Sequence, residues 1–249
     1  MTLELLSLWG SLTFTPDSFS DGGSYASVEE AVAAGLAMVE QGALIVDVGG
    51  ESTRPGASPV SIEEELRRVE EVVRRLAAEG VCVSVDTRHA EVAQACIEAG
   101  ASIINDVTGF RDPEMVKVAT SCDAGLVAMH MKGDDPRTMQ DEPCYDDVVD
   151  EVATYLKNRA EMLEDAGIER ERICLDPGPW FRENSQANYS AYAKLPGICS
   201  FGISLMVAVS RKSYIGMPTT LMIQSNEMTL QRQKPFLACE LWCVGDSNS

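Results

Sequence analysis

The chain has 249 residues, of which 45% are hydrophobic and 24% are charged, and its formal net charge at pH 7 is −19. This composition excludes disordered, collagen-like and low-complexity proteins, and the length is typical of a single α/β barrel domain. The acidic balance argues against a protein that binds nucleic acid through a basic face, so we expect no nucleic-acid partner.

Short apolar runs alternate along the chain with longer amphipathic stretches. The runs predict strands at residues 3–14, 43–48, 81–85, 102–107, 125–129, 173–175 and 205–209. The stretches predict helices at residues 27–41, 61–80, 89–100, 112–121, 148–167 and 188–195, with one more beginning within 236–244. Ser27 and Ser61 stand where N-caps belong, with glutamates following in the first turn.

Strict alternation of strands and helices implies a parallel sheet. Two architectures fit a parallel sheet of this kind, a doubly wound sheet and a (β/α)₈ barrel. For the barrel, no eighth strand is evident. No GxGxxG motif follows the first strand, which disfavours a dinucleotide-binding fold. No linker separates the units, so we expect one domain over residues 1–249.

The eight cysteines form no CxxC pair and no Cys/His cluster with zinc spacing. Cys82 and Cys174 stand inside apolar runs, which predicts reduced cysteines that act as small core residues. The N-terminus lacks the basic segment of a secretory signal, and no apolar run reaches the roughly 20 residues that span a bilayer. We therefore expect a cytoplasmic protein with no membrane partner.

Polar residues follow every predicted strand, where parallel α/β proteins place their chemistry. Asp86, Asn105, Asp176 and Lys212 make a set of donors and acceptors suited to a flat heterocycle, because a carboxylate accepts paired N–H bonds and an amide both donates and accepts. Arg54, in a loop rich in Gly and Pro, suits an anion.

Structural roles explain some of these residues as well. An aspartate after a strand often caps the next helix, which applies to Asp86 and Asp106, and Asn105 can satisfy loop backbone. His89 and His130 have no partner at metal-ligand spacing and are predicted to be structural. Helix capping alone does not explain why this set of Asp, Asn, Asp and Lys residues occurs together at one end of a sheet.

At these residues the sequence resembles dihydropteroate synthases, the sulfonamide targets of folate biosynthesis. The resemblance rests on seven motifs in family order, which are TPDSFSDGG (15–23), DVGGESTRPGA (47–57), SVDT (84–87), INDV (104–107), MHMKGDDPRTMQ (129–140), LDPG (175–178) and SRKSYIG (210–216). It implies a (β/α)₈ barrel and the condensation of 6-hydroxymethyl-7,8-dihydropterin pyrophosphate with p-aminobenzoate. The implied partners are these small molecules, with Mg²⁺ as cofactor and a homodimer as the assembly.

The resemblance also implies roles for particular residues of this chain. Those matching the pterin site are Thr53, Asp86, Asn105, Asp176 and Lys212, of which Asp86, Asp176 and Lys212 are the expected catalytic residues. Those matching the p-aminobenzoate site are Thr53, Pro55, Phe181 and Ser213, and Arg54 matches a diphosphate contact. Thr13 stands where the family has an Asn near the magnesium ion, and a Thr hydroxyl is a weaker oxygen ligand than an amide carbonyl.

The C-terminal part departs from the family pattern. After Gly178 the family continues Gly-Phe-Gly-Lys, whereas this chain has Trp180, Phe181, Arg182 and Glu183. The family's final strand with its Arg-x-His motif is not found, and residues 217–249 are divergent. We therefore expect a barrel without its eighth strand, and hypothesise that residues 179–187 and 217–249 are degraded sequence, through a frameshift or a sequence error.

Three functions follow from these motifs and departures. The first is a dihydropteroate synthase, in full or impaired form. The second is a non-catalytic pterin-binding paralogue or relic, which the missing anion motif favours. The third is a pterin-binding methyltransferase domain, which needs a corrinoid partner; the motifs TPDSFSDGG and SRKSYIG favour the synthase over it.

Overall fold

In the computed structural model, the described residues are 9–13, 27–52, 58–133, 147–178 and 203–206. Strands and helices alternate along them. Their bounds are β1 (Trp9–Thr13), α1 (Val28–Glu40), β2 (Ile45–Gly49), α2 (Ile62–Ala78), β3 (Cys82–Asp86), α3 (Ala90–Glu98), β4 (Ile103–Asp106), α4 (Pro113–Thr120), β5 (Gly125–Met129), α5 (Val148–Asp165), the 3₁₀ helix η2 (Arg170–Arg172), β6 (Ile173–Asp176) and β7 (Ser204–Leu205).

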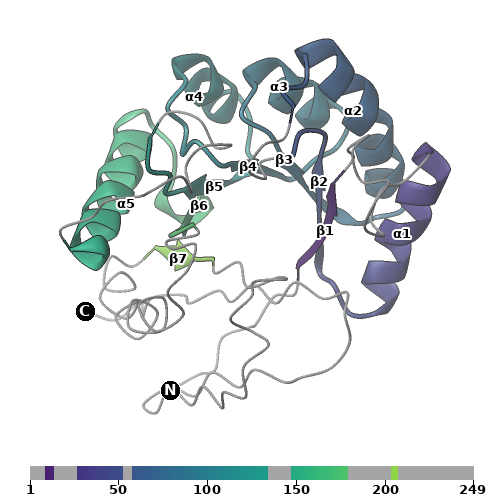
Figure 1. Cartoon of the computed structure of the whole chain (residues 1–249), viewed down its shortest axis with the longest axis horizontal. Coiled ribbons are helices and arrows are strands. Elements are labelled where there is room, and N and C mark those ends of the chain that lie inside the picture. Colours follow the sequence, from purple (N-terminus) through teal and green to yellow (C-terminus); the bar gives the residue numbers. More distant parts are fainter. Residues whose placement is uncertain (1–8, 14–26, 53–57, 134–146, 179–202, 207–249) are drawn as a thin grey trace.

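The seven strands form one parallel sheet in which each strand pairs with the next along the chain. A doubly wound sheet reverses its strand order at a switch point, so this consecutive order is that of a barrel. Figure 1 shows the sheet curled, with the helices on its outer side. The expected barrel-type α/β fold is therefore confirmed, and the described residues contain no eighth strand.

The predicted elements that fall on described residues are present, with shifted ends. The first strand begins at Trp9 within the described residues, and the last is Ser204–Leu205 rather than 205–209. The helix predicted to reach residue 167 ends at Asp165, because Gly167 has a positive φ of 94°. The 3₁₀ helix was not predicted, and the helices predicted at 188–195 and 236–244 lie outside the described residues.

The helices begin where the sequence places capping residues. The Ser27 hydroxyl accepts a hydrogen bond from the Glu30 N–H at 3.2 Å, and the Ser61 hydroxyl accepts one from Glu64 at 3.3 Å. The Asp112 carboxylate accepts the Glu114 N–H at 2.9 Å, just before the helix that starts with a proline. Each such cap contributes about 1 kcal/mol, and together they fix the helix starts relative to the preceding strands.

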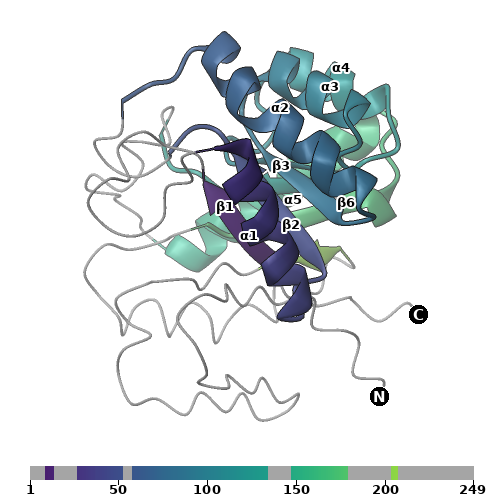
Figure 2. The ribbon, with the colours of Figure 1, turned by 90° about the vertical axis from the view of Figure 1, so that its right-hand side faces the viewer.

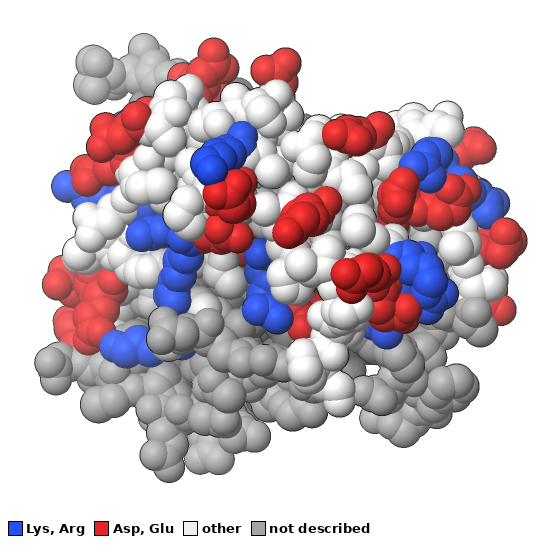
Figure 3. Space-filling view, turned by 90° about the horizontal axis from the view of Figure 1, so that it is seen from above, with Lys and Arg blue, Asp and Glu red and all other residues white. Residues whose placement is uncertain are grey.

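The outer face of the sheet packs against the helices, as Figure 2 shows for α1 and α2 across β1 to β3. Val46, Val83 and Val85 are fully buried there against Val72 and Leu76 of α2. The opposite side of the helical layer is charged, and Figure 3 shows acidic and basic side chains interspersed on it. Among the described helices, none combines the length and apolarity needed to cross a membrane.

The inner face has its own apolar cluster. Trp9 of β1, Val127 of β5, Cys174 of β6 and Met206 after β7 are all at most 3% exposed and pack together. Strands this far apart in the sheet order meet only across the concave side of a curled sheet. This cluster, called the floor below, therefore marks the interior of the barrel, and Cys174 is buried in the core as predicted.

Candidate active site

Polar side chains stand above the floor on the inner face of the sheet. Side chains alternate between the two faces of a strand. Ile103 packs against the floor, so Asn105 shares its inner face, and Asp176 shares the inner face of Cys174. Asp86 is the direct partner of Asn105 on the neighbouring strand and so points the same way. The structure thus brings three predicted site residues to the carboxyl ends of β3, β4 and β6.

Asp86 is a half-buried carboxyl that no hydrogen-bond donor contacts within the described part of the chain. Burial raises the pKa of Asp86 well above its ordinary value, and the nearby charges of Asp47 and Glu65 raise it further. Within the described residues, Asp86 therefore has neither a hydrogen-bond donor nor a counter-charge. A ligand that brings N–H donors or positive charge supplies what the carboxyl lacks.

Asp47 of β2 is a second acid inside the barrel and is only 7% exposed. The Asn105 Nδ2 donates to both of its carboxylate oxygens, at 3.4 Å each. Burial raises the pKa of Asp47 to about 6, which the nearby Ser84 hydroxyl and the Asn105 amide offset only in part. Sequence analysis did not select Asp47, although it is the one acid in the apolar run ALIVDV.

Asp176 is held at the end of β6 by backbone bonds. Its Oδ1 accepts the Gly178 N–H at 2.8 Å, and its carbonyl oxygen accepts the His130 N–H at 2.7 Å. Gly178 has a φ of 71°, and a Cβ there would lie 2.4 Å from the His130 carbonyl oxygen. Only glycine fits this close approach, so the Asp-Pro-Gly sequence fixes the direction in which the Asp176 side chain points.

Asp106 has the structural role that was considered for it, but in a turn rather than as a helix cap. Its Oδ1 accepts bonds from the Thr108 N–H at 2.8 Å and hydroxyl at 2.7 Å, and its Oδ2 accepts the Phe110 N–H at 2.8 Å. Asp86 caps no helix, because His89 occupies the N-cap position of α3. The two strand-end aspartates therefore differ: one is fully bonded and the other is not.

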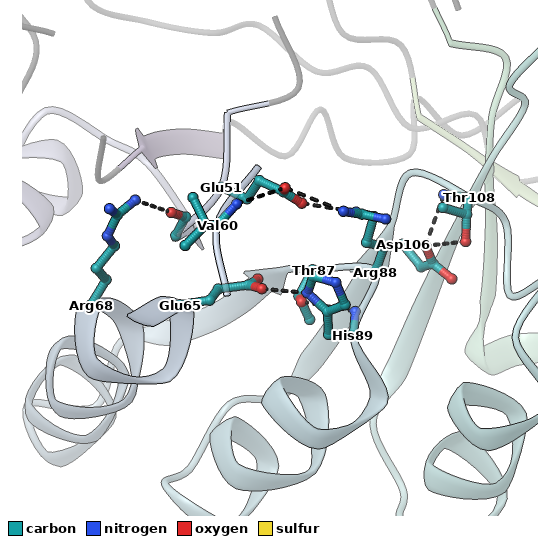
Figure 4. Close-up of polar contacts among 10 residues, drawn as sticks. Glu51, Val60, Glu65, Arg68, Thr87, Arg88, His89, Asp106 and Thr108 are labelled. Atoms are coloured by element: carbon teal, nitrogen blue, oxygen red, sulfur yellow. Dashed lines mark hydrogen bonds and ion pairs between the residues drawn. The ribbon is translucent and has the colours of Figure 1, made fainter. Parts of the chain in front are cut away.

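An ion pair joins the loop after β2 to the loop after β3 (Figure 4). The Arg88 guanidinium donates to both Glu51 carboxylate oxygens, at 2.8 and 3.2 Å. Glu51 also accepts the Val60 N–H at 3.4 Å, so it links both described ends of its own loop. Although burial alone raises the pKa of Glu51, the Arg88 guanidinium holds it below the ordinary value. This pair was not predicted, since its members lie far apart in the sequence.

A second pair lies beside it and ties α2 to the start of α3 (Figure 4). His89 Nδ1 lies 2.6 Å from a Glu65 carboxylate oxygen, and Glu65 is only 1% exposed. This hydrogen bond raises the pKa of His89. Arg68 donates to the Gly50 carbonyl oxygen at 2.7 Å. The other histidine, His130, is only 5% exposed, and its burial lowers its pKa to about 4.

The other predicted site residues are not placed by the structure. Thr53, Arg54, Pro55, Phe181, Lys212 and Ser213 lie outside the described residues. The backbone of Thr13 pairs with Gly49 at the end of β1, while its side chain lies outside them. Among the described residues, no three His, Cys, Asp or Glu side chains are grouped so that they could hold a metal ion.

Comparison with known proteins identifies the family. A family model described as pterin binding enzyme matches residues 9–247. The dihydropteroate synthase of Escherichia coli (strain K12) is 46% identical over 208 residues, which are 83% of this chain and 73% of the relative.

Two solved structures extend the likeness to three dimensions. Xanthomonas albilineans dihydropteroate synthase with 4-aminobenzoic acid has 44% identity and a TM-score of 0.77, covering 87% of this chain and 77% of that one. Yersinia pestis dihydropteroate synthase with a sulfonamide drug has 40% identity and a TM-score of 0.78, covering 84% and 76%. The barrel order of the strands, the inward Asp86, Asn105 and Asp176, and these likenesses agree: the chain belongs to the dihydropteroate synthase family of pterin-binding enzymes.

Proposed function

We propose that this protein is a dihydropteroate synthase, a transferase of folate biosynthesis. It condenses 6-hydroxymethyl-7,8-dihydropterin pyrophosphate with p-aminobenzoate to give 7,8-dihydropteroate and pyrophosphate. The single observation that carries the proposal is the Asp86 carboxyl beside Asn105 inside the barrel, which receives no hydrogen bond from the described residues, in a chain of this family. A pterin ring has the N–H groups that such acceptors require.

The pterin lies, in this proposal, between Asp86, Asn105 and Asp176, above the floor. Thr53 and Lys212 complete its site, Arg54 contacts the diphosphate, and the p-aminobenzoate site consists of Thr53, Pro55, Phe181 and Ser213. These assignments rest on the matching motifs, and for the three inward residues also on their shared face of the sheet.

The reaction is a displacement at the exocyclic methylene carbon of the pterin. The C–O bond to the diphosphate breaks, and its electron pair leaves with pyrophosphate. Positive charge then develops on the methylene and spreads into the ring, where the carboxylates of Asp86 and Asp176 stabilise it. The amine nitrogen of p-aminobenzoate forms the new C–N bond and loses a proton. No covalent enzyme intermediate is required.

Magnesium is proposed as the cation that stabilises charge on the leaving diphosphate. The described residues do not make up a site for it, and the Thr13 hydroxyl is a weaker ligand than the family's amide. The proposal for Mg²⁺ therefore rests on the resemblance alone. Activity that disappears with EDTA and returns with added Mg²⁺ would support it, whereas activity unchanged by EDTA would remove Mg²⁺ from the reaction.

We further propose a single domain that acts in the cytoplasm as a homodimer. These points also rest on the resemblance to the family and on the continuous alternation of strands and helices. Light scattering of the purified protein across a concentration series tests the dimer, and a monomer mass throughout the series would contradict it.

The decisive experiment is an assay of pyrophosphate release from the pterin pyrophosphate, with and without p-aminobenzoate. Release that requires p-aminobenzoate, together with formation of dihydropteroate, establishes the synthase. Binding of the pterin pyrophosphate without release would instead favour a non-catalytic pterin-binding relic. The matched control is Asp86→Asn, which keeps the side-chain shape and should lose pterin binding.

A further inference from the structure

Asp47 and Asn105 meet across the inside of the barrel, in front of β3. They come from β2 and β4, and their side chains are 7% and 8% exposed. In barrels of this kind, each interior layer is built by side chains from alternate strands. The contact therefore belongs to the layer directly above the floor, and both residues are held by the sheet rather than by a loop.

The chemistry of the pair fixes which way the Asn105 amide faces. A carboxylate can only accept hydrogen bonds, so it must face the amide nitrogen, and the Asn105 Nδ2 lies 3.4 Å from each Asp47 oxygen. The amide oxygen consequently points away from Asp47. Within the described residues, no hydrogen-bond donor contacts that oxygen. Asn105 thus offers a free acceptor to a ligand.

We propose that Asp47 is a positioning residue that holds the Asn105 amide with its oxygen toward the pterin ring. The site then presents two acceptors side by side, the Asn105 oxygen and the Asp86 carboxyl, and selects a ring edge with two N–H donors. This inference rests on the proposed function, because it names a residue that acts on the pterin through Asn105. Asp47 itself needs no contact with the ligand.

Asp106 is a natural control for Asp47. It is also a buried aspartate on an inner strand, immediately after Asn105, yet it points to the other face and bonds to the Thr108 and Phe110 backbone N–H groups. Replacing it removes a buried carboxylate of the same size as Asp47, but from β4, next to Asn105. Asp106→Asn should therefore lower stability without altering pterin affinity.

The test is a double-mutant cycle on the affinity for 7,8-dihydropteroate, measured by calorimetry with the full chain. The variants are Asp47→Asn, Asn105→Ala and the double variant, with Asp106→Asn as the control. Asn at position 47 keeps the size of the side chain but lets either end of the Asn105 amide face it. We expect Asp47→Asn to weaken binding about tenfold, the equivalent of one hydrogen bond to the ligand.

In the Asn105→Ala background, the same Asp47→Asn change should have no further effect, because its intermediary is gone. Equal losses in both backgrounds would overturn the positioning role while leaving the proposed function intact. Absence of binding by the unmodified chain would overturn both. Circular dichroism checks the fold of each variant. If Asp47→Asn does not fold, Asp47→Ser removes the carboxylate with a smaller side chain and is judged by the same criterion.

Discussion

Arg88 and Glu51 form a two-bond ion pair, at 2.8 and 3.2 Å, that joins the loops following β2 and β3. Glu51 is 8% exposed, so its charge depends on Arg88 for a partner. Breaking a buried pair leaves one charge without compensation, which costs more than the pair itself contributes. Arg88 directly follows Thr87, so the pair lies next to the end of β3, which carries Asp86.

Replacing Arg88 should therefore destabilise the protein. We expect Arg88→Met to lower the free energy of unfolding by about 2 kcal/mol, measured by urea denaturation at pH 7. The matched control is Arg67→Met, which removes an exposed partner of Glu64 and should cost much less. Equal losses in the two variants would show that the Glu51 pair is no stronger than a surface pair.

The Glu65–His89 bond makes part of the stability depend on pH. Because the pKa of His89 is raised in the folded state, that state binds the proton more tightly than the unfolded chain. The contribution is complete below the ordinary histidine pKa of about 6.5 and is lost as pH rises through the raised value. The difference in unfolding free energy between the parent and His89→Ala should thus be larger at pH 6 than at pH 9. A difference that does not vary with pH would contradict this account.

Asp86 should cost the protein stability while serving its function. Its carboxyl has a raised pKa, so the folded state ionises it less readily than the unfolded chain does. We expect Asp86→Asn to increase the free energy of unfolding at pH 7 by about 1 kcal/mol or more, and to abolish binding of the pterin pyrophosphate. Thermal unfolding and calorimetry measure the two effects. Retained binding would remove Asp86 from the site, whatever the change in stability.

Gly178 should tolerate no side chain. Its φ of 71° disfavours other residues, and a Cβ would clash with the His130 carbonyl oxygen. Gly178→Ala should lower the unfolding free energy by about 2 kcal/mol or more. Gly80→Ala provides the control, because Gly80 has a similar φ of 79° with nothing within 4 Å of the added Cβ. The excess loss at Gly178 over Gly80 measures the clash, and equal losses would rule it out.

The sequence was sufficient for the described strands and α-helices and for the inward residues of β3, β4 and β6. Apolar runs such as Gly125–Met129 predicted strands because a strand covered on both faces must be apolar throughout. Asp86, Asn105 and Asp176 could be grouped because parallel strands bring their carboxyl ends to one edge. That rule depends on the topology of the sheet alone, so it can be applied to a sequence before the structure is known.

The contacts between these elements could not be predicted in the same way. The pairing of Asp47 with Asn105 depends on the curvature of the sheet, which brings β2 and β4 together in front of β3. The Glu51–Arg88 pair depends on the paths of two loops, and no local pattern links residues so far apart. The same limit explains why Asp106 and Asp86, alike in sequence position, could not be told apart.

The floor of the barrel also bears on how the chain comes to be folded. The Trp9 side chain packs against Val127, Cys174 and Met206, which are synthesised long after it. A nascent chain that has made only β1 to β4 therefore exposes an indole and one face of several strands. Such non-local closure is slow, and the exposed surface invites aggregation until β5 to β7 arrive.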